Sequence, residues 1–374
     1  MSILEEMQKR MMAEVWKDLR SCLANSECND VCKDTCPMHL VRDKDEKFTP
    51  RRIAKSASEV FQGKMEHPSE KMELIFSCFV CRRCMAECPA KIDLATAKVM
   101  ARAALTRAGF YPKTLDGLAK NVLEYDNPFG LEEDRFDWLD KELPRSDTLY
   151  FVGCNYGFRE PEAAKATVDV LKGLGIDFTV SRDEACCGAP LNLMGRIPVT
   201  MDYMKKNVRT IKEGNINTVI TSCTDCYTVL KLIYGMVIPD VRVMHVSEAL
   251  LNALKKRDTD LKPLNMKVAY HDPCTLTRVM KITEQPRKVL RSIPGLKVVE
   301  FEANREHTSC CGAGGLQLAI NEELSFKWAK MRMDESKALG VDAIVTACSG
   351  CKVNFRLLQE SPVMSVAEVL SKAL

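Results

Sequence analysis

The sequence predicts a helical N-terminal domain followed by two similar α/β lobes. Three observations lead to this prediction. Two runs of cysteines in the first 89 residues lie beside stretches with helical periodicity. From residue 149 onward, apolar strand-like runs alternate with helix-like runs, as in parallel α/β units. This second part of the chain also repeats its motifs at offsets of 120 to 125 residues.

The composition supports folded domains and excludes several classes of protein. Of the 374 residues, 46% are hydrophobic and 28% are charged, so sizeable cores can be buried and long disorder is not expected. The net charge of +3 gives no reason to expect a nucleic-acid partner. No run of 18 apolar residues occurs, so no transmembrane segment is expected. The N-terminus lacks the apolar core of a signal peptide, and we therefore expect a cytoplasmic protein.

Cysteine usage points to metal. The chain has 18 cysteines and only 5 histidines. In a reducing compartment disulfides are a poor explanation for so many thiols, whereas bound metal explains them. Soft thiolate ligands favour zinc, copper(I) or iron–sulfur clusters, and the small number of histidines argues against Cys2His2 zinc sites.

The helical domain is expected to cover residues 1–110. Helical patterns occupy the amphipathic N-terminus, the stretch FTPRRIAKSASEVFQGK and the stretch LATAKVMARAALTRAGF. Residues 111–147 are rich in proline and acidic side chains and read as a linker with a short helix. We place the domain boundary near Pro144.

The two lobes are expected at residues 148–258 and 264–374. In the first lobe TLYFVGC, INTVITSC and VRVMHVS read as strands, and EPEAAKATVDVLKGLG reads as a helix that ends at glycine. The second lobe repeats the order with MKVAYHDPC, HTSCCGAGG, VDAIVTACSGC and VMSVAEVLSKAL. Two homologous Rossmann-like α/β lobes explain this repetition better than chance does.

The N-terminal cysteines have ferredoxin spacing. Residues 78–89 read CFVCRRCMAECP, which is the C-x2-C-x2-C-x3-C-P run of bacterial-type ferredoxins. An upstream run with irregular spacing ends at Pro37 and supplies a partner set. The flanking helices favour an α-helical ferredoxin-like domain with two 4Fe–4S cubanes. We assign one cubane to Cys22, Cys28, Cys32 and Cys88, and the other to Cys36, Cys78, Cys81 and Cys84.

Alternatives remain for this domain. A structural zinc knuckle needs only four thiolates and no Cys-Pro turn. The irregular set is also compatible with a labile cluster or with one non-cysteine ligand. Arg82 and Arg83 lie between ligands, where positive charge would raise a cluster's reduction potential, unless they simply face solvent.

Each lobe carries five cysteines in the same order: a lone cysteine, a vicinal pair followed by glycine, and a C-x2-C pair. Lone cysteines and C-x2-C pairs follow predicted strands, and sites of open α/β sheets gather at the carboxyl ends of strands. We therefore expect the five thiols of each lobe to converge in one pocket. Redox-active C-x2-C pairs and zinc sites are the alternatives. The sets are Cys154, Cys186, Cys187, Cys223 and Cys226, then Cys274, Cys310, Cys311, Cys348 and Cys351.

On these motifs the chain resembles the cysteine-rich CCG family of heterodisulfide reductases, in the form that fuses the ferredoxin-like and CCG parts. FTPRR with the ferredoxin run resembles the small part, and GCNYGFREPEAA, ACCGAP, HDPCTLTR and CCGAGG resemble the CCG part. The resemblance implies two cubanes and up to two non-cubane 4Fe–4S clusters. Departures at Thr275, Thr277 and Leu316 put the substrate in doubt more than cluster binding.

The resemblance implies an oxidoreductase subunit of anaerobic metabolism that passes electrons from the cubanes to the CCG lobes and reduces a disulfide. His271 is either a proton donor there or a structural residue. The implied catalytic group is Cys274, Cys310, Cys311, Cys348, Cys351 and His271.

Two other functions remain open. The chain could be a pure electron conduit for a flavin-dependent dehydrogenase of the glycolate, lactate or glycerol-3-phosphate type, or for a CoA-ester reductase complex. It could also be a structural zinc-binding module. No flavin motif occurs in the sequence, so FAD is expected only in a partner subunit of a hetero-oligomeric complex. A cytochrome b partner would place the chain peripherally at a membrane surface.

Overall fold

The computed structural model describes residues 3–25, 28–256 and 259–374. The chain divides into two compact units. The helical unit contains Met1–Asp116, Pro190–Ile197 and Gly312–Trp328, and the α/β unit contains Gly117–Ala189, Pro198–Cys311 and Ala329–Leu374. In the described part of the chain, no helix is both long enough and apolar enough to cross a bilayer.

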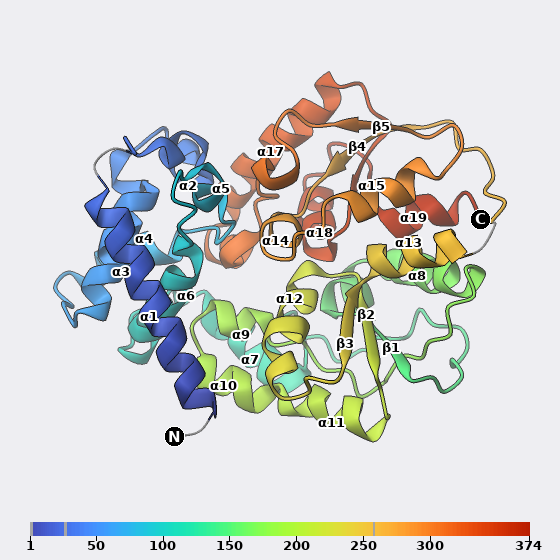
Figure 1. Ribbon diagram of the computed structural model, residues 1–374, viewed down its shortest axis with the longest axis horizontal. Helices are drawn as coiled ribbons and strands as arrows, with labels where there is room; N and C mark the ends of the chain where they lie inside the picture. The colour runs from blue at the N-terminus through green and yellow to red at the C-terminus, as the bar shows by residue number, and fades with distance from the viewer. Residues whose placement is uncertain (1–2, 26–27, 257–258) are drawn as a thin grey trace. The chain divides into compact units, whose positions relative to one another are not determined.

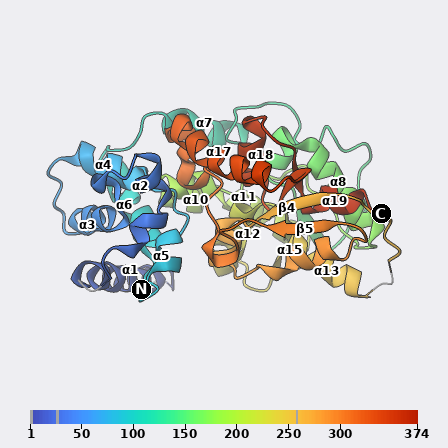
Figure 2. The ribbon, with the colours of Figure 1, turned by 90° about the horizontal axis from the view of Figure 1, so that it is seen from above.

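Helices form the N-terminal part, as the sequence predicts. Thr49 caps α3 by accepting a hydrogen bond from the backbone N–H of Arg52, and Pro50 occupies the first helical turn, where a missing N–H costs nothing. Helix α3 packs against α1, α4 and α6 around buried apolar side chains (Figures 1 and 2). The helices of this unit are α1 (Ile3–Ala24), α2 (Pro37–Val41), α3 (Pro50–Phe61), α4 (Pro68–Phe76), α5 (Arg83–Glu87), α6 (Leu94–Arg107), α9 (Ala189–Leu193) and α16 (Gln317–Ile320).

The first lobe of the α/β unit contains a parallel sheet in the order β1-β2-β3. Leu149 also makes a parallel bridge to Thr179, which lies where a further strand would pair with β1. The strands are β1 (Thr148–Phe151), β2 (Thr218–Thr221) and β3 (Arg242–His245). The helices are α7 (Leu115–Tyr125), α8 (Pro161–Gly173), α10 (Ile197–Tyr203), α11 (Lys205–Glu213), α12 (Thr224–Leu232) and α13 (Val246–Lys256).

The second lobe repeats this arrangement with a parallel sheet in the order β5-β4-β6-β7. With Thr179 counted beside β1, both sheets have the same order, which confirms the internal repeat. The strands are β4 (Lys267–His271), β5 (Lys297–Glu300), β6 (Ala343–Thr346) and β7 (Val363–Ser365). The helices are α14 (Cys274–Arg278), α15 (Glu284–Arg291), α17 (Glu322–Ala338), α18 (Ser349–Leu357) and α19 (Val366–Ser371). The first part of α17, up to Trp328, belongs to the helical unit.

The segment between the helical stretch and β1 is packed structure and not only a connection. From Gly117 onward it belongs to the α/β unit, and α7 fills its first part. Phe136 is 1% exposed and Arg135 is 5% exposed. Residues that the sequence suggested as a linker therefore contribute side chains to the core of the α/β unit.

Candidate functional site

The lone cysteines and the C-x2-C pairs of the α/β unit follow the carboxyl ends of strands, as expected. Cys154 follows β1 and opens a π-helical turn at Asn155–Arg159, and Cys274 begins α14 just after β4. Cys223 and Cys348 are the N-cap residues of α12 and α18. No disulfide occurs among the described residues, which include all eighteen cysteines.

These ten thiols form one continuous chain of side-chain hydrogen bonds. In each lobe the lone cysteine contacts the vicinal pair, and the pair contacts the C-x2-C cysteines. The two lobes meet where Cys223 contacts Cys348, and the hydroxyl of Thr224 lies 3.0 Å from the same Cys348 sulfur. Each thiol contacts the next in the spatial order Cys154, Cys186, Cys187, Cys226, Cys223, Cys348, Cys351, Cys311, Cys310 and Cys274.

The vicinal pairs have the same electrostatic character in both lobes. Cys187 accepts hydrogen bonds from Cys186 and Cys226, and these bonds lower the pKa of its thiol. The pKa of Cys311 is lowered in the same way by its contacts with Cys310 and Cys351. Hydrogen bonds to a charged form favour that form, so the second cysteine of each pair is prepared to be a thiolate, the form that ligates metal.

A glycine permits the close approach of strand β1 to the C-x2-C pair. Gly153 has a φ of +77°, and a Cβ atom there would lie 3.2 Å from the Cys226 sulfur. Any other residue would meet both the backbone strain of the left-handed region and this contact.

A buried ion pair holds the cysteine loops of the first lobe. The carboxylate of Glu184 accepts hydrogen bonds from the backbone N–H groups of Val152 and Gly153, at 2.8 and 2.9 Å. Arg135 donates to the same carboxylate at 2.6 Å. The loop before Cys186 is thereby fixed to the end of β1. Sequence reasoning missed both charged residues, because no motif connects them.

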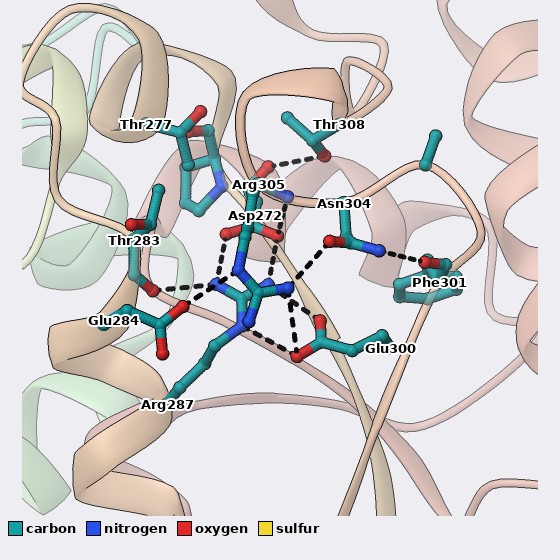
Figure 3. Close-up of polar contacts among 12 residues, drawn as sticks. Asp272, Thr277, Thr283, Glu284, Arg287, Glu300, Phe301, Asn304, Arg305 and Thr308 are labelled. Carbon is teal, nitrogen blue, oxygen red and sulfur yellow. Dashed lines mark hydrogen bonds and ion pairs between the residues drawn. The ribbon is translucent and has the colours of Figure 1, made fainter.

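A different buried network holds the second lobe (Figure 3). Arg287 donates to both carboxylate oxygens of Asp272, at 2.7 and 2.6 Å, and to both of Glu300, at 2.8 and 2.7 Å. Asp272 also accepts from the backbone N–H of Arg305 at 2.8 Å. The side chains of Asp272 and Arg287 are 0% exposed. Asp272 therefore joins the chain just before Pro273 to α15 and to the loop at Arg305.

The cysteines of the helical unit also gather in two groups, but Cys84, which the sequence assigned to the second cubane, lines the cavity of the first group as well. A cavity beside α1, α5 and the start of α6 is lined by five cysteines and by Val31 and Leu94, among other residues. The second group is indicated by electrostatic interactions of Cys36 and Cys84 with Cys78 and Cys81. The five cysteines that line the cavity are Cys22, Cys28, Cys32, Cys84 and Cys88. Ligation within these two groups remains a prediction.

Arg51 organises the irregular loop that carries Cys28. Its guanidinium donates to the carbonyls of Asn25 and Leu23, at 2.8 and 2.9 Å, and to the Cys28 sulfur at 3.8 Å. It also forms an ion pair with Asp30 at 3.3 Å. Arg51 belongs to the FTPRR motif, so the sequence pointed to this residue. Its contacts with the loop of Cys28 could not be predicted from the motif.

Lys98 is a buried cation on the cysteine-facing side of α6. It is 2% exposed and lies one turn from Leu94, which lines the first cavity. One turn further on, Arg102 donates to the carbonyl of Cys78 at 2.7 Å. Burial by itself would lower the pKa of Lys98. The electrostatic attraction of thiolates in both cysteine groups, chiefly Cys78 and Cys84, is the larger effect, so the pKa of Lys98 is raised.

Arg82 and Arg83 are engaged in local ion pairs. Arg82 pairs with Asp93 at 2.9 Å and Arg83 pairs with Glu87 at 3.1 Å. Their charges are thus largely compensated. The positive charge that lies among the cysteines belongs to Lys98 instead, a residue that the ligand spacing did not indicate.

Two histidines at strand ends have opposite surroundings. His245 is buried, and its ring nitrogens lie 2.8 Å from the Ser247 hydroxyl and 2.9 Å from the Ala347 carbonyl, which makes it structural. His271 is also fully buried, but its ring packs edge-on against Phe355 with ring centroids 4.8 Å apart. Neither of its nitrogens has a hydrogen-bond partner among the described residues. Burial lowers the pKa of His271 well below its ordinary value.

We expect replacement of these histidines by phenylalanine to have opposite effects on stability. His271→Phe removes an unpartnered polar ring and is expected to be neutral or stabilising, by up to about 1 kcal/mol. His245→Phe leaves the Ala347 carbonyl without its donor and is expected to cost about 1–3 kcal/mol. Thermal unfolding of the anaerobic holoprotein measures both. A large loss of stability in the His271 variant would show that its ring has a partner.

The donor sets fit iron–sulfur clusters by chemistry. In the described residues, no group of three or more His, Cys, Asp or Glu side chains is arranged to hold a single metal ion. A 4Fe–4S cubane places a different demand on the protein, because each of its four irons takes one cysteine thiolate, so the four sulfurs surround a cluster and not a single ion. Thiolates are the ligands that such clusters use, and the cysteines gather in groups of at least four in both units.

Comparison with known families accounts for every cysteine. The 4Fe-4S dicluster domain family matches residues 7–93, which contain the eight cysteines of the helical unit. The cysteine-rich domain family CCG matches residues 148–231 and 268–356, and each match contains the five cysteines of one lobe.

Several proteins that resemble this chain are named as oxidoreductases or as their subunits. The chain is 30% identical to a dihydromethanophenazine:CoB–CoM heterodisulfide reductase subunit of Methanosarcina acetivorans, over 92% of this chain and 90% of the relative. It is 29% identical to a fumarate reductase (CoM/CoB) subunit of Methanothermobacter marburgensis, over 96% of this chain and 73% of the relative. It is 30% identical to an EtfAB:quinone oxidoreductase of Syntrophomonas wolfei, over 81% of this chain and 47% of the relative.

Proposed function

From the premise that this chain belongs to the CCG family of heterodisulfide reductase-type iron–sulfur proteins, we propose that its two lobes form one joint terminal site that reduces a disulfide. The chain is an iron–sulfur subunit of an oxidoreductase and relays electrons. Cleavage of R–S–S–R′ to RSH and R′SH takes up two electrons and two protons. Bound clusters would supply the electrons one at a time.

The observation that carries the proposal is the meeting of the two five-cysteine sets. Because Cys223 contacts Cys348, the sets form one group of ten thiols and not two isolated pockets. Nine of the ten cysteines are buried, and Cys274 is partly exposed. We therefore propose that the substrate approaches the joint site from the Cys274 side.

We propose that the helical unit supplies electrons to this site. The group of Cys22, Cys28, Cys32 and Cys88 would hold one cubane, and the group of Cys36, Cys78, Cys81 and Cys84 would hold the other. Segments 190–197 and 312–328, which belong to the helical unit, follow the vicinal cysteine pairs closely in the sequence. Within that unit, Arg102 bonds both the Cys78 carbonyl and the Gly315 carbonyl, at 2.7 and 3.0 Å.

The donor would be a partner subunit that carries FAD or cytochrome b. The cavity beside Cys22 and Cys28 supports entry at that group, because Val31 on its rim is 42% exposed. A peripheral position at a membrane would follow from a cytochrome b partner. Isolation of the complex and identification of its redox cofactors tests this part of the proposal.

Metal analysis tests the ligand assignment as a whole. Four clusters of four irons predict about sixteen irons, with matching acid-labile sulfide, in anaerobically purified protein. The reason is that eight ferredoxin-type and ten CCG-type thiols are available in two units. Elemental analysis measures the iron-to-protein ratio, and zinc serves as the internal comparison. Stoichiometric zinc with little sulfide would refute the assignment.

A pure electron conduit is the second candidate function. The similarity to an EtfAB:quinone oxidoreductase favours it, because that relative's name describes electron transfer between protein and quinone. Turnover of disulfides with a reduced dye separates the two functions. The terminal-site proposal expects thiol products, whereas a conduit would become reduced without forming them.

A further inference from the structure

Arg135 lies at the first cysteine set although it comes from the segment before the first lobe. Its Nη2 atom is 3.8 Å from the Cys154 sulfur, within hydrogen-bond distance for a sulfur acceptor. Its side chain is 6% exposed. The same guanidinium donates to Glu184 at 2.6 Å and to the Asp126 carbonyl at 2.7 Å, so its position is fixed on three sides.

The surrounding structure is shaped for this side chain. Arg135 lies over the ring of Phe158, with its guanidinium carbon 5.4 Å from the ring centre. A Cβ atom on Gly157 would overlap the aliphatic part of Arg135. The π-helical turn after Cys154 can therefore lie against the Arg135 side chain only because residue 157 is glycine. Rotation of the guanidinium away from the sulfur is therefore restricted.

We propose that Arg135 sets the reduction potential of the cluster held by the first lobe, by donating an N–H bond to the Cys154 ligand together with the part of its positive charge that Glu184 leaves uncompensated. Reduction adds negative charge to a thiolate-bound cluster, and hydrogen bonds to the ligating sulfurs favour the reduced state. The charge acts in a buried environment, where it is screened less than at the surface. This inference rests on the proposed ligation by the first-lobe cysteines.

The second lobe is built differently at the corresponding positions. The internal repeat places Thr308 where the first lobe has Glu184, and Arg278 where it has Phe158. The Thr308 hydroxyl donates to the Asp272 carbonyl at 3.0 Å, so the loop before the second vicinal pair is tied without a carboxylate. The pair of Arg135 and Glu184 is thus specific to the first lobe, and changing it should affect one cluster selectively.

The two members of the pair predict shifts of opposite sign. Glu184→Gln removes the negative charge and leaves Arg135 in place, so the first-lobe potential should rise. Adding Arg135→Met to Glu184→Gln removes the cation without leaving an unpaired buried carboxylate. Relative to Glu184→Gln alone, this second change should lower the one-electron reduction equilibrium constant about tenfold, or about 59 mV.

The experiment is a reductive titration of the anaerobic holoprotein followed by electron paramagnetic resonance, with iron and sulfide measured for each variant. The other clusters serve as internal standards, and only one signal should move. Arg182→Met is the matched control, because Arg182 is a half-exposed cation of the same lobe paired with Asp134. Its loss should leave all signals in place, because solvent screens the charge.

The outcomes separate this inference from the proposed function. If the wild-type protein holds no iron beyond its cubanes, the ligation proposal fails. If all clusters are present and the double variant has the same first-lobe potential as Glu184→Gln, or a higher one, the assignment of Arg135 is overturned. If the double variant does not load iron, Arg135→Lys with Glu184 intact keeps the charge, and its equilibrium constant for reduction should fall by clearly less than the roughly tenfold drop expected for loss of the cation. A drop of about tenfold or more would overturn the role of the charge.

Discussion

A Cys311→Ala variant is expected to lose disulfide turnover while the cubanes of the helical unit still accept electrons. Cys311 is 5% exposed and receives hydrogen bonds from Cys310 and Cys351 at the centre of the second set. Removal of a ligand should reduce turnover by more than the roughly 10–100-fold that loss of an outer hydrogen-bond partner costs. Turnover with the natural donor and the paramagnetic signals of the cubanes are the two measurements.

Two further variants make this expectation specific. Cys187→Ala changes the corresponding cysteine of the first lobe, and it should also abolish turnover if the ten thiols form one terminal site. Cys81→Ser should prevent reduction by the natural donor, while a small dye that reaches the lobes still supports some turnover. Cluster binding is coupled to folding, so iron content and circular dichroism must be checked first.

The result that contradicts the terminal site is equally clear. A folded Cys311 variant whose cubanes become reduced and whose turnover stays at the wild-type level excludes the second lobe. Loss of activity in the Cys187 variant alone would then confine the site to the first set. Retention of activity in both variants would favour the electron-conduit function.

An Asp272→Ala variant is expected to lose about 3–5 kcal/mol of stability, because it leaves Arg287 partly uncompensated in a buried position. Glu300 would remain as one partner of Arg287, at 2.7 Å. The Asp272 side chain also accepts a hydrogen bond from the backbone N–H of Arg305, so the loop that leads to Cys310 would lose one of its attachments (Figure 3). We expect iron to be lost from the second set before the first. Thermal unfolding and iron content measure the two effects.

The matched control is Asp202→Ala, which removes a carboxylate from an ion pair with Lys205 in which both side chains are 75% exposed. Exposed pairs contribute about 0–1 kcal/mol, so this variant should unfold like the wild type. Asp272→Asn keeps the shape of the side chain and should have an intermediate effect. Wild-type stability of Asp272→Ala would show that Glu300 alone suffices for Arg287.

Sequence spacing was enough to predict the local features of this protein. Strands and helices followed from apolar periodicity, and the repeat followed from motif offsets, because both are properties of neighbouring residues. The convergence of five thiols in each lobe followed from one topological rule, that the carboxyl ends of parallel strands lie at one edge of a sheet. Cys154 and Cys274 lie after β1 and β4 as that rule requires.

Only the tertiary structure decided which charged groups and which cysteines meet across long stretches of chain. The contact between Cys223 and Cys348 joins the lobes, and Arg135 reaches Cys154 from a segment that reads as a linker. The position of Arg82 between predicted ligands suggests that its charge acts on a cluster, but an ion pair with Asp93 compensates that charge. Periodicity reports which face of an element is buried, but not which side chain of another element fills that face. The sequence by itself therefore predicted the donor atoms and the five-cysteine set of each lobe, and packing determined how the two sets meet and which charges surround them.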